Sequence, residues 1–257
     1  MAPPCWLVDL DGVVWLADQP IPGADRAVAA LRERGVRVAF FTNNSFPAHA
    51  HHLEKLRRFG IEVPPEDLLS SAQAAAALVA PGERALVLGG AGIVEALEAR
   101  GVEVQTAGAP GEDARSAFDA VVVGIDPGLD YRRLARAVTA VLGGARLIGT
   151  NEDATFPSPS GPLPGAGSVL AAVACASGAE PVVAGKPHDP AVALVQERLG
   201  AVETVVGDRP STDGALARRL GARFALVLSG VTPAGHGALD PAPDIEAEDL
   251  GALATQV

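Results

Sequence analysis

Short apolar runs alternate with amphipathic segments along this chain of 257 residues, and this alternation constrains the fold more than any other feature. The apolar run CWLVDL at 5–10 precedes a segment with helical spacing at 24–34, which is followed by a glycine. The pattern repeats with VRVAFFT at 36–42 and a helical segment at 48–59. Strands that alternate with helices form parallel sheets covered by helices, so the sequence predicts an α/β fold.

The same alternation continues through the rest of the chain. It predicts strands at 84–88, 120–124, 146–149, 204–206 and 224–228, and helices at 93–100, 131–142, 168–177, 190–199 and 213–220. The segments 109–116 and 156–167 are predicted loops, and the end of the chain from residue 232 is predicted to hold at most one short helix. The length allows one large domain or two smaller ones.

Composition excludes several classes of protein. The formal net charge of −11 at pH 7 disfavours nucleic-acid binding, because the chain would repel a phosphate backbone. The beginning of the chain has no basic leader pattern, and no apolar run reaches the length of a membrane helix, so we expect a cytoplasmic protein without a membrane partner. Cys5 and Cys175 are predicted to be reduced thiols in or near the core. His49, His51 and His52 are predicted to lie on a solvated helix face rather than to bind metal.

Two carboxylates, Asp9 and Asp11, follow the first predicted strand, and Gly12 allows a sharp turn after them. Ligands of open parallel sheets bind beyond the carboxyl ends of the strands. One carboxylate there can attack phosphorus and the other can transfer a proton, and such a pair suits Mg²⁺. Acids also occur as turn residues after strands, so the pair alone leaves that alternative open.

Three further strand ends or turns carry complementary groups. Thr42 closes the second strand with a hydroxyl suited to phosphate, although TNNS is also a good start for a helix. Lys186 offers a cation, and Asp208 and Asp213 offer carboxylates. A nucleophile, a hydroxyl, a cation and metal ligands at successive strand ends are what phosphoryl transfer requires.

These motifs resemble those of the haloacid dehalogenase superfamily, and more narrowly its NagD and 4-nitrophenylphosphatase branch. The resemblance is carried by DLDGV at 9–13, TNNS at 42–45, GKP at 185–187, GDRPSTD at 207–213, GTNED at 149–153 and PGAG at 164–167. It implies a Rossmann-like core of residues 1–78 and 182–257 with an inserted α/β cap of type C2A at 79–181. It also implies a phosphatase that uses Mg²⁺, and a homodimer formed through the cap.

The resemblance assigns a role to each matching residue. Asp9 is implied to be the nucleophile and a Mg²⁺ ligand, and Asp11 the acid and base that binds Mg²⁺ through its carbonyl group. Lys186 is implied to stabilise charge, while Asp208 and Asp213 complete the metal site. The residues implied to bind phosphate or substrate are Thr42, Asn43, Asn44, Gly12, Asn151 and Asp153.

One departure and several alternatives accompany this interpretation. Pro210 and Ser211 stand where the family usually has Leu followed by an acid, which affects the expected Mg²⁺ affinity. The segment 152–161, implied to select the substrate, contains no Lys or Arg. Glycerol phosphate and phosphoglycolate are the expected substrates, with sugar phosphates, nucleoside monophosphates and pyridoxal phosphate as alternatives. A phosphomutase, a non-enzymatic metabolite sensor and an oxidoreductase suggested by glycines at 89–92 are the competing functions; those glycines are better explained as the start of a helix.

Overall fold

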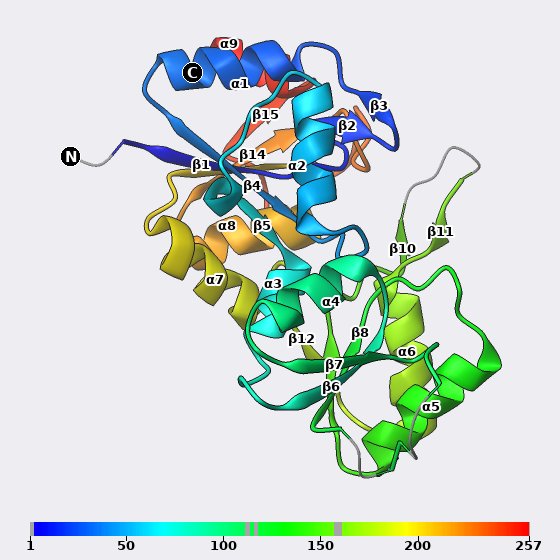
Figure 1. Ribbon diagram of the computed structural model, residues 1–257. Helices are drawn as coiled ribbons and strands as arrows, with labels where there is room; N and C mark the ends of the chain where they lie inside the picture. Colours follow the sequence, from blue (N-terminus) through cyan, green and yellow to red (C-terminus); the bar gives the residue numbers. More distant parts are fainter. Residues whose placement is uncertain (1–2, 111–113, 116–117, 157–160, 257) are drawn as a thin grey trace. The chain divides into compact units, whose positions relative to one another are not determined.

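The computed structural model describes residues 3–110, 114–115, 118–156 and 161–256, which form two compact units (Figure 1). The first unit comprises Met1–Thr42, His52–Leu69 and Lys186–Val257. The second comprises Asn43–His51 and Ser70–Gly185. The cap that the sequence places at 79–181 lies inside the long segment of the second unit, and its boundaries stay a prediction.

The first unit is built on a six-stranded sheet with the order β15-β14-β13-β1-β4-β5. Its strands are β1 (Cys5–Val8), β4 (Arg37–Thr42), β5 (Leu68–Ser70), β13 (Thr204–Gly207), β14 (Arg223–Val227) and β15 (Ile245–Ala247). β1 lies between β13 and β4 and runs parallel to both, with Val8 opposite Val206 and Phe40. The carboxyl ends of these three strands therefore meet at one edge, where a parallel sheet places its ligands.

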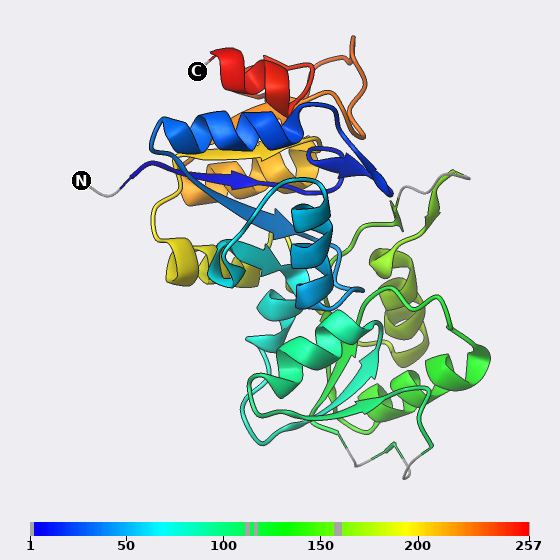
Figure 2. The ribbon, with the colours of Figure 1, turned by 45° about the horizontal axis from the view of Figure 1, so that its top comes forward.

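Helices cover both faces of this sheet. One face packs against α1 (Ala24–Glu33), α2 (His49–Arg58) and α9 (Leu250–Gln256), whose buried residues share one apolar cluster with β1, β4 and β14. α1 and α9 lie side by side over the sheet in Figures 1 and 2. The remaining helices of this unit are α7 (Asp189–Leu199) and α8 (Ala215–Leu220), with the short helical turns η1 (Pro65–Asp67) and η2 (Pro210–Gly214). Because both faces are covered, all of β1 is buried and apolar without alternation.

The second unit holds a five-stranded sheet in which every paired strand is parallel, with the order β12-β9-β8-β6-β7. Its strands are β6 (Arg84–Leu88), β7 (Glu103–Thr106), β8 (Ala120–Val123), β9 (Arg146–Gly149) and β12 (Val182–Val183). α5 (Tyr131–Leu142) and α6 (Ala166–Ser177) pack together and share an apolar cluster with β6, β8 and β9. α3 (Ser71–Ala76) and α4 (Ala91–Glu98) also pack on each other, and α4 contacts β6 and β7.

The predicted α/β class with parallel sheets is confirmed, and the short elements were missed. Two hairpins are made of strands of two residues each: β2 (Trp15–Leu16) with β3 (Gln19–Pro20), and β10 (Thr155–Phe156) with β11 (Leu163–Pro164). Phe156 of β10 and both residues of β11 fall inside the predicted loop at 156–167, so that prediction was wrong there. Strands of two residues are too short to show a period in the sequence. Residues 157–160 of that loop, and 111–113 and 116 of the predicted loop at 109–116, lie outside the described residues.

Two predictions about single residues also need correction. His52 is only 3% exposed rather than solvated, because it lies one helical turn before buried Leu56 on the face of α2 that packs on the core. Cys5 is buried as expected, whereas Cys175 on α6 is exposed. Within the part of the chain that the structure describes, no helix is long and apolar enough to cross a membrane.

The second unit offers a direct test of its core. Leu86 on β6 is fully buried, whereas Leu142 at the end of α5 is 63% exposed. We expect Leu86→Ala to lower the free energy of unfolding by about 2–5 kcal/mol, because it leaves a cavity. Leu142→Ala, the same change at an exposed position, is expected to alter it by no more than about 0.5 kcal/mol. Urea denaturation measures both, and equal effects would contradict the assignment of this core.

Candidate active site

Asp9 follows directly after β1, at the edge where the ends of β1, β4 and β13 meet. Its backbone N–H donates to the carbonyl oxygen of Val206 on β13 over 2.9 Å, which continues the sheet by one residue. Its side chain is 13% exposed, so the carboxylate is largely withdrawn from water. The strand thus ends by presenting a nearly buried carboxylate at the ligand-binding edge of the sheet.

The ammonium group of Lys186 lies between two carboxylates. Its Nζ is 2.9 Å from Oδ1 of Asp9 and 2.7 Å from Oδ1 of Asp213, and it also donates to the carbonyl oxygen of Phe41 over 3.0 Å. The side chain is only 3% exposed. Burial opposes the charge of Lys186, but Asp213 and Asp9 outweigh it and raise the pKa of this ammonium group. Lys186 is therefore a fixed positive charge beside Asp9.

Asp208 follows β13 and is held by the loop after β14. The backbone N–H of Val231 donates to its Oδ2 over 2.6 Å, and the hydroxyl of Thr232 donates to its carbonyl oxygen over 2.6 Å. Gly12 has φ of +84° and faces Oδ2 of Asp208 so closely that a Cβ would collide with it. The sequence marked Asp208 but missed Val231 and Thr232, because loop contacts carry no periodic signal.

The carboxylates of Asp9, Asp208 and Asp213 form one cluster, in which one oxygen from each lies within 4.8 Å of the others. Burial raises the pKa of Asp9 well above its ordinary value, opposed by Lys186 and reinforced by Asp213 and Asp208. Burial and the repulsion of Asp213 raise the pKa of Asp208 to about 6. Three clustered carboxylates with one ammonium group leave an excess of negative charge. Such an oxygen-rich, electronegative cluster fits a hard divalent cation such as Mg²⁺.

Asp11 lies beyond Asp9 and makes two contacts of its own. Its Oδ1 accepts a hydrogen bond of 3.0 Å from the indole N–H of Trp15, and its Oδ2 lies 3.5 Å from the hydroxyl of Thr42, which is buried. The backbone N–H of Gly12, predicted to bind phosphate, donates to the carbonyl oxygen of Trp15 over 2.7 Å. The first unit thus brings Asp9, Asp11, Thr42, Lys186, Asp208 and Asp213 together.

The other predicted ligands belong to the second unit, where three of them form a network. The carbonyl oxygen of Asn43 accepts from Nδ2 of Asn151 and from the hydroxyl of Ser71, each over 2.7 Å. Nδ2 of Asn43 donates to Asp153 over 3.3 Å, and the N–H of Asp153 donates to Oδ1 of Asn151 over 3.1 Å. Oδ1 of Asn44 accepts from the N–H of Phe46 over 3.1 Å and caps the local turn.

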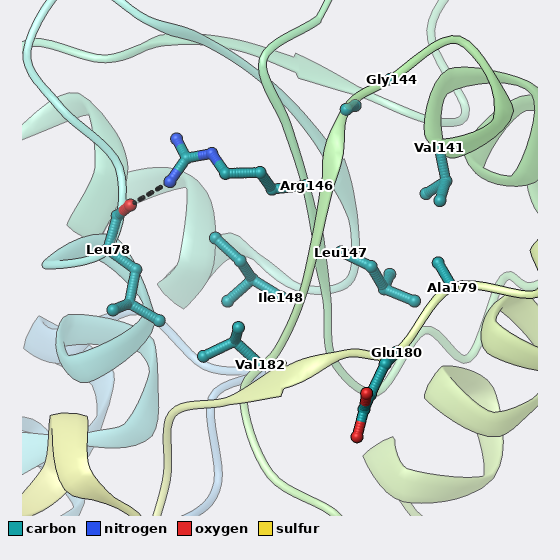
Figure 3. A pocket seen from close by; sticks show the side chains of 10 residues that line it. Leu78, Val141, Gly144, Arg146, Leu147, Ile148, Ala179, Glu180 and Val182 are labelled. Atoms are coloured by element: carbon teal, nitrogen blue, oxygen red, sulfur yellow. Dashed lines mark hydrogen bonds between the residues drawn. The ribbon is translucent and has the colours of Figure 1, made fainter.

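A hollow of about 340 Å³ in the second unit does not have the character of a phosphate site. It lies at the amino end of β9, next to β12, whereas Asn151 and Asp153 follow the carboxyl end of β9. Figure 3 shows mainly apolar side chains around it, with Arg146 bonded to the carbonyl oxygen of Leu78 over 2.8 Å. Arg146 also pairs with Glu83 over 2.6 Å, so its charge is already neutralised.

The geometry of the first unit suits phosphoryl transfer. A carboxylate held beside a fixed cation can attack phosphorus, and a second carboxylate two residues later can transfer a proton. The cation and a bound metal would neutralise charge that develops on the phosphoryl oxygens.

Comparisons with known proteins agree with this geometry. Residues 6–103 match the family model described as haloacid dehalogenase-like hydrolase, and residues 183–253 match a second model described as HAD-hydrolase-like. The dihydroxyacetone phosphatase of Corynebacterium glutamicum is 36% identical over 88% of this chain and 82% of its own length.

Solved structures extend the similarity to nearly the whole chain. The p-nitrophenyl phosphatase of Archaeoglobus fulgidus has a TM-score of 0.88 at 31% identity and covers 100% of both chains. The glycerol phosphate phosphatase of Mycobacterium tuberculosis, solved in complex with magnesium, has a TM-score of 0.85 at 33% identity and covers 98% of this chain and 76% of that one. The chain therefore belongs to the haloacid dehalogenase-like hydrolases, in their 4-nitrophenylphosphatase-like branch, and is a phosphatase.

Proposed function

We propose that this phosphatase hydrolyses phosphate monoesters of small polyols, with Asp9 as its nucleophile and Mg²⁺ as its cofactor. The observation that carries the proposal is the nearly buried carboxylate of Asp9, held 2.9 Å from the ammonium group of Lys186 within a cluster of acids. Lys186 opposes the protonation of Asp9 that burial favours, and a divalent cation bound in the acidic cluster would add to this effect and favour the anionic form that a nucleophile needs.

Asp9 begins the reaction by attacking the phosphorus atom with one carboxylate oxygen. The bond from phosphorus to the ester oxygen breaks, and Asp11 gives its proton to that oxygen, so that the alcohol leaves. Water then attacks the phosphorus of the aspartyl-phosphate and gives a proton to Asp11. The bond between phosphorus and Asp9 breaks, which restores the carboxylate and releases inorganic phosphate.

The remaining residues of the first unit bind and neutralise the phosphoryl group. We assign the hydroxyl of Thr42 and the ammonium group of Lys186 to the oxygens of the phosphoryl group. Asp9, Asp208 and Asp213 would hold Mg²⁺, and the carbonyl group of Asp11 is the fourth protein ligand that we assign. When bound, Mg²⁺ supplies positive charge that stabilises the transition state.

The substrate class rests on charge and on the relatives. The segment 152–161 contains no Lys or Arg, so it offers no cation for a second anionic group on the substrate. The names of two similar proteins specify dihydroxyacetone and glycerol phosphate. These observations favour an uncharged three-carbon leaving group over phosphoglycolate.

Phosphate release from a panel of substrates tests this proposal. We expect release from glycerol 3-phosphate, dihydroxyacetone phosphate and 4-nitrophenyl phosphate in the presence of Mg²⁺, and its loss with EDTA. Phosphoglycolate is expected to give a lower kcat/KM than glycerol 3-phosphate, because its carboxylate lacks a cationic partner. Preference for phosphoglycolate would refute the substrate class, and full activity in EDTA would refute the cofactor.

Replacement of the nucleophile is the sharpest test of the mechanism. Asp9→Asn keeps the size of the side chain but removes the attacking oxygen anion, so we expect kcat to fall by at least about 10³-fold. Glu197→Gln neutralises an exposed acid on α7 and is expected to leave kcat unchanged. A phosphoenzyme trapped by acid quenching in the wild type should be absent in Asp9→Asn. Near-normal turnover of Asp9→Asn would exclude Asp9 as the nucleophile.

The crowding of carboxylates predicts a pH-dependent stability. The pKa of Asp208 is about 6 in the folded protein, against an ordinary value of 3.8. The folded state thus binds this proton more tightly, so without metal this group increasingly disfavours folding as the pH rises from 3.8 to about 6, above which the penalty is complete. We expect metal-free Asp208→Asn to be more stable than the wild type at pH 7.5, by about 1–3 kcal/mol, and this gain to vanish near pH 4.

Asp244 provides a control of opposite sign for this experiment. Arg218 and the N–H of Phe224 lower the pKa of Asp244, so its stabilisation is present at neutral pH and is lost as the pH falls through its folded pKa. Urea denaturation between pH 4 and 8 measures Asp208→Asn and Asp244→Asn. Asp244→Asn is expected to be less stable than the wild type throughout this range, because the pKa of Asp244 lies below its ordinary value of 3.8. Mg²⁺ should stabilise the wild type and have less effect on Asp208→Asn. If metal-free Asp208→Asn is less stable than the wild type at pH 7.5, the clustered carboxylates do not destabilise the folded protein and this prediction fails.

A further inference from the structure

We propose that Trp15 is a positioning residue for Asp11, which it holds in the orientation for proton transfer. This inference rests on the proposed function, in which Asp11 acts as the acid and the base. The indole N–H of Trp15 donates to Oδ1 of Asp11 over 3.0 Å. An indole N–H is a donor only, and the Trp15 side chain is just 1% exposed, so the ring is fixed with its donor aimed at the carboxylate.

The two oxygens of Asp11 differ as a result. Oδ1 is engaged by Trp15, whereas within the described part of the chain Oδ2 has the longer contact of 3.5 Å with the hydroxyl of Thr42. Thr42 is assigned to the phosphate, so Oδ2 lies on the side where the substrate binds. We therefore infer that Oδ2 transfers the proton while Trp15 fixes the rotation of the carboxylate.

The turn between β1 and β2 sets the backbone of Trp15. The N–H of Trp15 donates to the carbonyl oxygen of Leu10 over 3.2 Å, and the carbonyl oxygen of Trp15 accepts from the N–H of Gly12 over 2.7 Å. These bonds close the turn that carries Asp11 back onto Trp15. The position of the indole and that of the carboxylate therefore depend on the same few backbone contacts.

Two side chains fix the indole ring of Trp15: Lys55 on α2 and Phe59 directly after α2. The edge of Phe59 contacts Trp15 with ring centroids 6.0 Å apart at 61°. The ammonium group of Lys55 lies 4.4 Å from the centre of the Trp15 ring and also donates to the carbonyl oxygen of Ala17 over 2.6 Å. A cation on the ring face withdraws electron density from the indole and so strengthens its N–H as a donor. α2 thereby supports the hydrogen bond to Asp11.

The leaving group provides a readout that distinguishes positioning from packing. The alkoxide leaving group of glycerol 3-phosphate needs a proton in the transition state, whereas 4-nitrophenolate leaves readily without one. kcat/KM covers the steps up to the aspartyl-phosphate and so includes loss of the leaving group. A misplaced Asp11 therefore lowers kcat/KM for glycerol 3-phosphate more than for 4-nitrophenyl phosphate, while a general structural defect lowers both values alike.

The experiment compares Trp15→Phe with Trp6→Phe, the same change at the other tryptophan of the chain. Trp6 is 2% exposed on β1 and serves as the matched control. We expect Trp15→Phe to lower kcat/KM about tenfold for glycerol 3-phosphate and less than about twofold for 4-nitrophenyl phosphate. Trp6→Phe should change the two values in equal proportion. Equal losses on both substrates in Trp15→Phe would overturn the inference.

Lys55→Met keeps the inference testable if Trp15→Phe does not fold. It leaves the indole donor in place but removes the cation from the ring, so we expect a loss of about threefold confined to glycerol 3-phosphate. A loss that is equal on both substrates, or no loss at all, would count against the support from α2 and against the inference.

Asp11→Asn separates this inference from the proposed mechanism. Loss of the acid should lower kcat/KM for glycerol 3-phosphate by at least about 100-fold and affect 4-nitrophenyl phosphate much less. If Asp11→Asn shows no dependence on the leaving group, the role of Asp11 fails and the inference fails with it. If Asp11→Asn shows that dependence and neither Trp15→Phe nor Lys55→Met does, the mechanism stands and only the role of Trp15 is overturned.

Discussion

The buried ammonium group of Lys186 is the interaction on which the site depends. It lies 2.9 Å from Asp9 and 2.7 Å from Asp213, and removal of one partner from such a buried pair leaves an uncompensated charge. Lys186 is also the first residue of the segment that returns to the first unit after Gly185. The connection between the units therefore ends by placing a cation beside the strand end that carries Asp9.

One ammonium group does not balance three carboxylates, and the consequence falls on Asp208. Its pKa of about 6 shows that the folded protein holds this charge against burial and the repulsion of Asp213. The N–H of Val231 and the hydroxyl of Thr232 keep it in place nevertheless. Active sites often retain such unfavourable charge because the ligand relieves it on binding. Here the relieving ligand that we propose is the divalent cation.

The sequence could predict which residues lie close together, because the carboxyl ends of parallel strands lie at the same edge of the sheet. Asp9, Thr42 and Asp208 follow or close β1, β4 and β13, which are neighbours in the sheet. Contacts made by short or irregular segments were not predictable. The bond between Trp15 and Asp11 depends on a hairpin with strands of two residues, and the bonds of Val231 and Thr232 on a loop. Neither segment has a periodicity that a sequence pattern could reveal.

The contacts that we assign to the chemistry lie in one of the two units. Every contact that we assign to the nucleophile, the acid and the metal cluster is made within the first unit, whereas the network of Asn43, Asn151 and Asp153 lies in the second. The second unit can therefore change its side chains without removing a charge from the phosphoryl-transfer site. Function in such folds depends on residues added to a shared scaffold. We propose that side chains of the second unit select the substrate, which would let relatives named for dihydroxyacetone and for glycerol phosphate share one phosphoryl-transfer site.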